Sequence, residues 1–315
     1  MSVLENNYRD FKCTYYEPQF PAQHQMIQPG IESIMRPLPI FDNPNYKGSD
    51  KLRGKVALIT GGDSGIGRAV AVAFAKEGAD LAISYLYEED DAKYTKDYVE
   101  KYGARCLLIE GDISSKEFCH KIIDRTIKHF GKLDILINNA GVQWPHDNGI
   151  ECISQYELEL TYKVNIFPMF YLVQAALPHL RSGSAIINTA SVTAYKGPED
   201  LIDYASTKGA VVTFTRSLSN SLIKKGIRVN AVAPGPIWTP LIVSSYSADK
   251  MATFGLDVPM KRAGQPYELA PTYVYLASED SSYVTGQVLH VNGGTMVDSL
   301  SLIHISEPTR LQLIS

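Results

Sequence analysis

The segment TGGDSGIG, Thr60 to Gly67, follows the unbroken apolar run Val56–Thr60 and precedes a run with helical periodicity. A glycine-rich turn between a buried strand and a helix lets the backbone approach a ligand closely. The free amides and the dipole at the helix N-terminus attract a pyrophosphate there. We therefore predict a strand-turn-helix unit that binds a dinucleotide. The glycines that provide this pattern are Gly61, Gly65 and Gly67.

Outward from this unit, short apolar runs alternate with segments of helical period. This alternation is typical of βαβ units that build a parallel sheet, and unbroken apolar runs indicate strands covered on both faces. We predict an α/β fold with a single-domain, Rossmann-type, doubly wound parallel sheet of about seven strands. The predicted strands are Val56–Thr60, Leu81–Tyr85, Arg105–Glu110, Ile135–Asn138, Ser184–Thr189, Arg228–Ala233 and Val288–Val291.

We expect the first 50 residues to form an arm rather than a domain. They are rich in Pro, Gln, Tyr and Asn, and the prolines exclude a long helix. Apolar and aromatic side chains are too numerous for a free linker, so we expect the arm to wrap over the body or a neighbouring subunit. A disordered leader is the alternative. Residues 51–299 are expected to form the catalytic domain.

Residues 300–315 do not continue the sequence pattern of the preceding domain. The run LSLIHISEPTR, Leu300 to Arg310, back-translates to a string that looks like the adapter left by transposase-based sequencing libraries. Our hypothesis is that the natural chain ends near Ser299 and that the tail is read-through of adapter DNA. Re-sequencing the source gene across this junction tests the hypothesis, and the same codons in genomic DNA would contradict it.

Composition excludes several classes of protein. The 30 basic and 34 acidic residues give a net charge of −4, so the chain has no excess positive field for nucleic acid. No run approaches the roughly 18 apolar residues of a membrane span, and the first ten residues lack a secretion-signal pattern, which favours the cytoplasm. The four cysteines include no C-x-x-C pair, so we expect reduced thiols and no metal site.

Four further motifs resemble the short-chain dehydrogenase/reductase family. The spacing TGxxxGxG is followed by NNAG, Asn138 to Gly141, and by YASTK, which places Tyr204 and Lys208 one helical turn apart. Ser191 lies thirteen residues before the tyrosine, and Asn165 lies in KVNIF. These positions match the catalytic tetrad of that family.

The resemblance implies a role for each member of the tetrad. Tyr204 would be the general acid/base. Lys208, with the positive charge of the oxidised nicotinamide, would lower the tyrosine pKa, and it would also hold the nicotinamide ribose. Ser191 would orient the substrate oxygen, and Asn165 would hold a water that continues the proton path. The implied activity is the NAD(P)-dependent interconversion of a carbonyl and an alcohol.

Cofactor choice depends on the end of the second strand. Relatives that prefer NAD carry an Asp where this chain has Tyr85, yet no Arg or Lys occupies Ser64 or Leu86, where NADP-preferring relatives often have one. Asp63 adds negative charge, so the balance leans to NAD or dual use of NAD and NADP. The residues expected to bind the cofactor are Gly61, Asp63, Ser64, Gly65, Ile66, Gly67, Tyr85, Asp112, Ile113, Asn139, Ala140, Gly141, Tyr204, Lys208, Pro234, Gly235, Ile237 and Thr239.

Substrate specificity is expected to come from a lid. The mixed polar and apolar stretch Leu241–Met260 stands where the family has its substrate lid. The partner is a small-molecule alcohol or carbonyl compound, with no nucleic acid and no membrane. Further specificity candidates, placed by analogy, are Gln143, Trp144, Thr193, Tyr195 and Tyr246.

Within the family, the leader, the turn and the run Met260–Pro271 look like one bacterial and plant branch. Its members are usually named general stress protein or glucose/ribitol dehydrogenase homologue.

Relatives are commonly tetramers, so a homotetramer is expected. One rival is a non-catalytic dinucleotide-binding stress or scaffold protein. A third hypothesis is a reductase of ketones bound to acyl carrier protein. It would need a basic patch beside the cleft to bind the acidic carrier, and Lys261 and Arg262 are the candidates.

Overall fold

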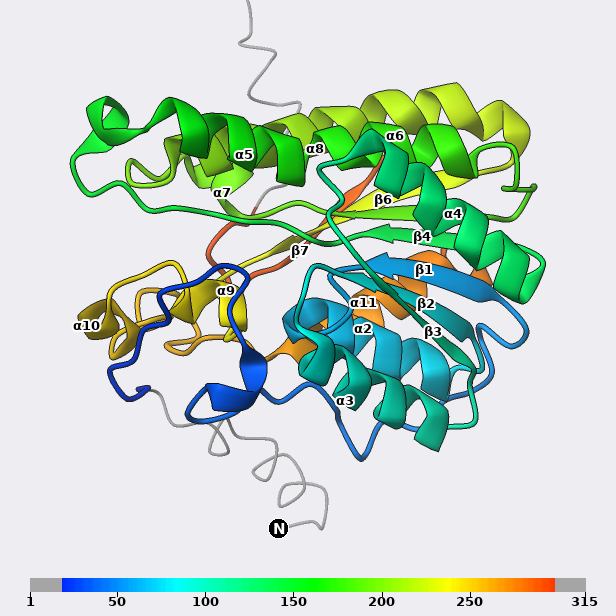
Figure 1. Cartoon of the computed structure of the whole chain (residues 1–315), viewed down its shortest axis with the longest axis horizontal. Helices are drawn as coiled ribbons and strands as arrows, with labels where there is room; N and C mark the ends of the chain where they lie inside the picture. The colour runs from blue at the N-terminus through cyan, green and yellow to red at the C-terminus, as the bar shows by residue number, and fades with distance from the viewer. Residues whose placement is uncertain (1–18, 298–315) are drawn as a thin grey trace, which may run out of the picture.

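Seven parallel strands form one sheet, in the order β3-β2-β1-β4-β5-β6-β7, in this computed structural model, which describes residues 19–297 (Figure 1). The fold class expected from the sequence is confirmed, and each strand end lies within one residue of its predicted position. The strands are β1 (Val56–Thr60), β2 (Asp80–Tyr85), β3 (Cys106–Glu110), β4 (Ile135–Asn138), β5 (Ala185–Thr189), β6 (Arg228–Pro234) and β7 (Val288–Val291).

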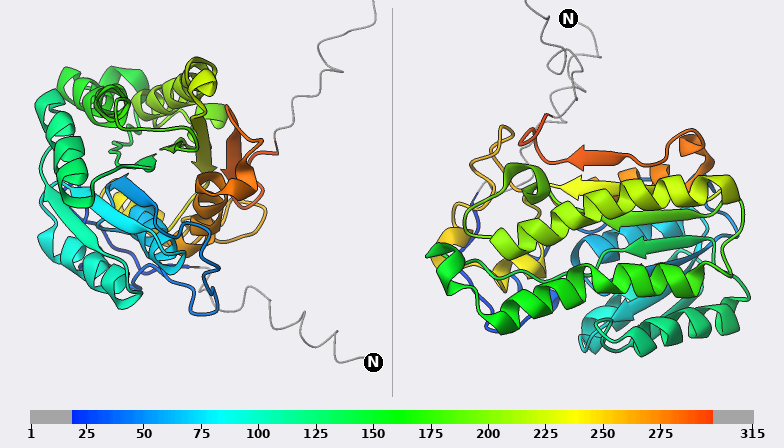
Figure 2. Two further views of the ribbon diagram at one scale, coloured as in Figure 1. Left: turned by 90° about the vertical axis from the view of Figure 1, so that its right-hand side faces the viewer. Right: turned by 90° about the horizontal axis from the view of Figure 1, so that it is seen from above.

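Helices cover both faces of the sheet, as Figures 1 and 2 show. One face carries α2 (Gly65–Lys76), α3 (Glu89–Lys101) and α11 (Pro266–Ala277). The other carries α4 (Lys116–Phe130), α5 (Gln155–Asn165), α6 (Phe167–Ala176) and α8 (Ile202–Leu222). The shorter helices are η1 (Glu32–Ile34), η2 (Gly149–Cys152), α7 (Thr193–Lys196), η3 (Ile223–Lys225), α9 (Pro240–Val243), α10 (Ala248–Met251) and η4 (Glu279–Ser281).

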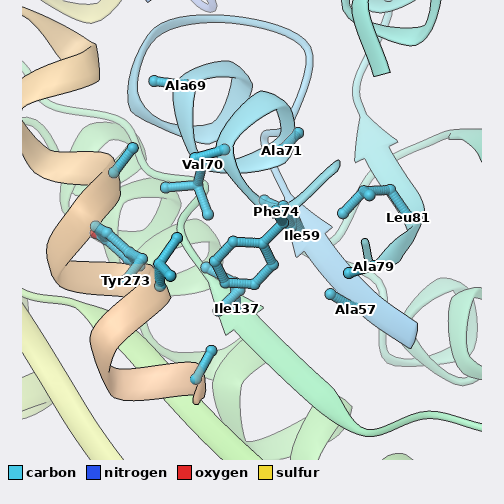
Figure 3. Packing of buried hydrophobic residues seen from close by; sticks show 14 of the residues in the cluster. Ala57, Ile59, Ala69, Val70, Ala71, Phe74, Ala79, Leu81, Ile137 and Tyr273 are labelled. Carbon is cyan, nitrogen blue, oxygen red and sulfur yellow. The ribbon is translucent and has the colours of Figure 1, made fainter. Parts of the chain in front are cut away.

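The apolar residues of β1 are divided between two cores. Because side chains alternate along a strand, Ala57 and Ile59 join the core under α2 and α11, whereas Leu58 joins the core on the opposite face. Figure 3 shows Phe74 of α2 and Tyr273 of α11 packed over this first core. A strand buried on both faces explains why its sequence is uniformly apolar.

The strand order reverses at β1. This strand pairs with β2 on one side and with β4 on the other, so Ala57 lies opposite both Leu81 and Ile135. The crossover connections leave the two sides in opposite directions at such a point and open a crevice beyond the carboxyl ends of the strands. The glycine-rich turn after β1 therefore lies at the mouth of this crevice.

The described part of the arm, residues 19–50, packs on the body of the chain. The Phe20 ring stacks on Trp238 with 3.7 Å between ring centroids, and the Trp238 indole Nε1 donates to the Pro37 carbonyl at 3.0 Å. Both Met35 and Trp238 are fully buried, in a small core shared with the lid residues Val243 and Met251. In Figure 1 the arm, in blue, accordingly runs beside α9 and α10. Residues 1–18 and the proposed adapter tail lie outside the described residues.

Of the four cysteines, Cys13 lies outside the described residues and the other three are free thiols. Cys106 and Cys119 are buried, and burial raises the pKa of each thiol to about 12, which makes them unreactive. Cys152 is exposed. Across residues 19–297, no helix is long and apolar enough to cross a membrane.

Candidate active site

One cleft of about 850 Å³ opens at the carboxyl edge of the sheet. Among the residues expected to bind the cofactor, all but Gly67 line it. Ser191, Tyr204 and Lys208 line it as well, whereas Asn165 lies behind its wall. Four of the five specificity candidates also border the cleft; the exception is Tyr195, whose ring packs against His290 instead.

The glycines of the turn have different tasks. Gly61 and Gly65 have φ of +62° and +51°, in the left-handed region that a side chain would strain. Gly67 has no such φ, but a Cβ there would overlap the Gly61 carbonyl oxygen and crowd the Asn139 side chain. Gly67 thus acts by letting α2 pack against the turn, and not by lining the cleft.

Asn139 and Thr60 hold this turn against β4. The Asn139 side-chain amide donates to the carbonyl oxygens of Thr60 and Gly61 at 3.1 and 3.0 Å. In return, the Thr60 hydroxyl oxygen accepts from the backbone amides of Asn139 and Ala140 at 3.0 and 3.1 Å. Thr60 is the first residue of the TGxxxGxG motif. It is not among the site residues expected from the sequence, and its position in the motif is the signal that could have identified it.

The end of the cleft beside β2 is acidic. Asp63, Glu88 and Asp112 line it together with Tyr85. Burial, reinforced by the charge of Glu88, raises the pKa of Asp63 to about 7. The Asp112 carboxylate accepts from the Ser114 amide and hydroxyl, both at 2.8 Å, so it also serves as a turn residue. Among the described lining residues of this end, where we expect adenosine to bind, no side chain is basic.

At the other end of the cleft, α8 brings Tyr204 and Lys208 together with Ser191, which follows β5. The Ser191 hydroxyl hydrogen-bonds the Tyr204 phenol. The Lys208 ammonium donates to the Thr189 carbonyl at 2.8 Å and lies 5.4 Å from the centroid of the Tyr204 ring. The hydroxyl, phenol and amine therefore share one wall of the cleft.

Burial dominates the protonation of this group. It raises the pKa of Tyr204 to about 12, although the hydrogen bond from Ser191 acts in the opposite direction. It also lowers the pKa of Lys208 to about 8. The lowering that the family resemblance implies comes from Lys208 together with an oxidised nicotinamide, so it stays a prediction. Near neutral pH the phenol carries its proton, and the lysine is mostly charged.

Asn165 is the last residue of α5. One residue separates it from α6, whose first turn contains Pro168. Its side chain is fully buried and pairs with the backbone of Val142, accepting from the amide at 2.8 Å and donating to the carbonyl at 2.9 Å. It also donates to the Thr207 hydroxyl at 3.2 Å. These contacts connect the loop after β4 to α8. The water that the family resemblance assigns to Asn165 stays a prediction.

Buried polar atoms in the cleft that have no hydrogen-bond partner test whether a dinucleotide fits. The Ser84 hydroxyl and Glu88 Oε1 at the acidic end have no hydrogen-bond partner among residues 19–297. The same holds for Gln143 Nε2 and the Thr193 hydroxyl at the end near Ser191. Buried polar groups are normally satisfied. Unpaired atoms at both ends of an elongated cleft fit a ligand with polar groups at both of its ends.

The arm forms part of the cleft wall, which the sequence did not reveal. Gln28, Pro29 and Gly30 line the cleft between its two ends. The Gln28 side-chain amide donates to the Gln143 carbonyl at 2.6 Å, and a Cβ on Gly30 would clash with the Pro240 carbonyl. No local pattern marks these residues, because their partners are distant in the sequence: Gln143 lies 115 positions from Gln28, and Tyr87, which donates to the Pro29 carbonyl, lies 58 positions from Pro29.

The fold and the cleft together place the chain among the Rossmann-type, dinucleotide-binding oxidoreductases. Its glycine turn opens at the switch point of a doubly wound sheet, which is where such proteins bind their cofactor. A phenol and an amine, Tyr204 and Lys208, are buried in the same cleft.

Comparisons with known proteins narrow this class to a family. The family model described as Enoyl-(Acyl carrier protein) reductase matches residues 61–296. General stress protein 39 of Bacillus subtilis (strain 168) is 56% identical over 282 residues, which cover 90% of this chain and 98% of the relative. Glucose and ribitol dehydrogenase of Daucus carota is 50% identical over 286 residues, with 89% and 98% covered. NADPH-dependent aldehyde reductase 1, chloroplastic, of Arabidopsis thaliana is 51% identical over 284 residues, with 88% and 98% covered.

Among solved structures, a short chain dehydrogenase from Burkholderia cenocepacia J2315 in complex with NADP has a TM-score of 0.71 and 29% identity. The match covers 78% of this chain and 98% of that one. The chain belongs to the short-chain dehydrogenase/reductase family. The branch expected from the sequence, that of the general stress proteins and the glucose and ribitol dehydrogenases, is confirmed.

Proposed function

We propose that this protein interconverts a carbonyl and an alcohol by NAD(P)-dependent hydride transfer, with Tyr204 as general acid/base. The observation that carries the proposal is the cluster of Ser191, Tyr204 and Lys208 on one wall of the cleft whose other end holds the glycine turn. The aldehyde reductase of A. thaliana, a relative, supports the same reaction type.

Each residue of the cluster has a task that its surroundings support. A phenol with a pKa near 12 holds its proton at neutral pH, so Tyr204 is ready to protonate a carbonyl oxygen during reduction. Ser191, whose hydroxyl lies beside that phenol, would turn its proton from the phenol to the same substrate oxygen when substrate binds. Lys208 supplies positive charge next to the phenol and favours the phenolate that forms when the proton leaves.

A bound nicotinamide dinucleotide would supply or accept the hydride. On the proposed arrangement, the turn around Gly65 and Ile66 holds the pyrophosphate and the acidic end holds adenosine. Lys208 and the segment from Pro234 to Thr239 hold the nicotinamide half. Gln143, Trp144, Thr193 and Tyr246 then remain to contact the substrate.

Turnover assays test the proposal directly. Oxidation of NADH and of NADPH is followed by nicotinamide absorbance against a panel of aldehydes, ketones and sugars, with protein that ends at Ser299. Substrate-dependent oxidation is the expected result. Tight binding of both cofactors without turnover across the panel would instead favour the non-catalytic scaffold.

For the cofactor, we propose a preference for NAD over NADP that depends on pH. The carboxyl of Asp63 ionises as pH rises through about 7, and Glu88 adds charge beside it. An ionised Asp63 repels the 2′-phosphate of NADP. The ratio of kcat/KM for NADPH to that for NADH should therefore fall between about pH 6.5 and 8.5, and Asp63→Asn should raise this ratio ~10-fold at the upper end.

The matched control is Asp90→Asn, because Asp90 is an exposed acid in the first turn of nearby α3. It should leave the ratio unchanged. The 2′-phosphate also titrates, near pH 6, so only the part of the pH dependence that Asp63→Asn removes belongs to Asp63. An NADPH to NADH ratio that Asp63→Asn leaves unaltered would refute the proposed repulsion.

The reductase of carrier-bound ketones receives less support from the structure. Its candidate basic pair is Lys261 and Arg262, and the Arg262 guanidinium forms a two-pronged ion pair with Glu268 at 2.8 and 2.7 Å. An arginine held by an internal carboxylate offers little attraction to an acidic carrier. The proposal therefore keeps a small-molecule substrate.

We also propose a homotetramer, working in the cytoplasm. On the outer face of α5 and α6, Leu158, Phe167 and Phe170 are 43, 40 and 47% exposed. Large apolar side chains grouped on one face are typical of a subunit interface. Light scattering of the native protein should give four times the chain mass, and Phe170→Glu should lower it. A monomeric mass for the wild type would refute the assembly.

A further inference from the structure

The arm contacts the glycine turn through one buried carboxylate. Glu32, in η1, is 1% exposed, and its Oε2 accepts a hydrogen bond from the Gly65 amide at 2.6 Å. The Gly65 amide is the first of α2, and the first amides of a helix have no carbonyl partner within it. The arm thus satisfies one amide of the turn, and Ile66, whose amide comes next, lines the cleft.

Arg68 connects this carboxylate to the other side of the turn. Its guanidinium is 2% exposed and forms an ion pair with Glu32. The same guanidinium donates twice to the Asp63 carbonyl, at 2.9 and 2.7 Å, and once to the Thr95 hydroxyl at 2.8 Å. Because Thr95 itself donates to the Asp63 carbonyl at 2.7 Å, that peptide group has little freedom to rotate.

The surroundings of Arg68 make this connection rigid. The guanidinium carbon lies 5.3 Å from the centroid of the Phe41 ring and 5.1 Å from that of Tyr94. Asp91 lies 3.4 Å from the guanidinium and accepts the Glu32 amide at 2.7 Å. Phe41 and Glu32 both belong to the arm, so the arm encloses the arginine from two sides.

The same stretch of the arm is attached to the lid. The Gln25 amide donates to the Val243 carbonyl at 2.8 Å, and the His24 ring nitrogen Nδ1 lies 2.7 Å from the Tyr246 carbonyl. The Gln28 side-chain amide reaches the Ser244 carbonyl at 3.4 Å. Residues 24–32 therefore span the cleft, from the substrate end to the glycine turn.

We propose that the arm is a positioning element of the dinucleotide site, with Glu32 holding the Gly65 amide and Arg68 holding the Asp63 carbonyl. This inference rests on the proposed function. The two contacts fix the peptide groups on either side of Ser64, and so fix the direction of the Ile66 amide that a pyrophosphate would use. Arg68 forms ion pairs with both Glu32 and Asp91, so it compensates part of the carboxylate charge beside a pyrophosphate.

Two substitutions of Glu32 test the proposal, with ADP-ribose, the part of NAD that lacks nicotinamide, as the probe. Glu32→Ala leaves the Gly65 amide and Arg68 without this partner, so the Kd of ADP-ribose should rise ~10-fold or more. Glu32→Gln keeps an acceptor for the amide and should recover most of the affinity. The kcat at saturating cofactor should change by less than ~2-fold, because the cluster around Tyr204 is untouched.

The control is Ser33→Ala, since Ser33 lies next in η1 and is exposed. It should alter neither value. In case Glu32→Ala folds poorly, hydrogen–deuterium exchange of the wild-type turn peptide gives a second measurement. The Gly65 amide should exchange slowly before any ADP-ribose is added, because a buried carboxylate accepts it.

Two results would overturn the inference: equal ADP-ribose affinity in wild type and a folded Glu32→Ala, or fast exchange of the Gly65 amide in the wild type. A wild type that fails to bind ADP-ribose at all would overturn the proposed function, and the inference with it. Binding by the wild type separates the two failures.

Discussion

Replacing Tyr204 with phenylalanine is expected to lower kcat by ~10²–10⁴-fold while ADP-ribose binding is retained. The substitution removes the phenol oxygen that Ser191 bonds and retains the ring, which is 7% exposed. Without that oxygen the substrate oxygen loses its proton donor. The measurement is kcat with the best substrate of the panel, together with a titration of ADP-ribose.

A matched control is Tyr283→Phe, because Tyr283 is fully exposed and is not among the residues that line the cleft. It should retain wild-type turnover. If Tyr204→Phe also retained wild-type turnover, Tyr204 would not be the general acid/base. If wild type and Tyr204→Phe both bound ADP-ribose and neither turned over any substrate, the scaffold reading would replace the enzyme.

Replacing Gly67 with alanine is expected to weaken ADP-ribose binding by ~10- to 100-fold and to lower stability by about 1–3 kcal/mol. A Cβ at this position meets the Gly61 carbonyl oxygen and the Asn139 side chain. These two groups are hydrogen-bonded to each other, and this bond holds the turn against β4. Relief of the overlap must therefore displace the turn itself. Calorimetric titration of ADP-ribose and thermal unfolding check the two effects.

Gly209→Ala provides the matched control, since Gly209 lies within α8 and a Cβ there meets nothing within 4 Å. Alanine at such a position should raise stability by about 0.5–1 kcal/mol and leave ADP-ribose binding as it is. Should Gly67→Ala bind ADP-ribose as tightly as the wild type, the close approach of α2 to the turn would not matter for the cofactor.

The parts of the molecule that local sequence patterns specify were predicted well. Unbroken apolar runs located all seven strands, because a strand buried on both faces needs an apolar side chain at every position. The turn was visible because its glycines are required by backbone conformation and close packing. Tyr204 and Lys208 were placed on one face of a helix by their spacing alone.

Protonation was not predictable in the same way. The sequence suggested that Lys208 and an oxidised nicotinamide together lower the pKa of Tyr204. The structure adds the opposing effect of burial, which raises this pKa to about 12. Solvent exclusion depends on every segment that covers the phenol, so it is a property of the assembled cleft. The pKa of Asp63 depends in the same way on burial and on Glu88, which approaches from the segment before α3.

The sequence by itself determined the doubly wound fold, the dinucleotide turn and the hydroxyl-phenol-amine cluster, because each follows from neighbours within a few residues or from one family motif. Only the tertiary structure decided that the arm belongs to the cleft. Glu32 meets Gly65 across 33 positions, and Gln28 meets Gln143 across 115. Contacts at that range follow no helical or strand period, so they exist only once the sheet has brought the segments together.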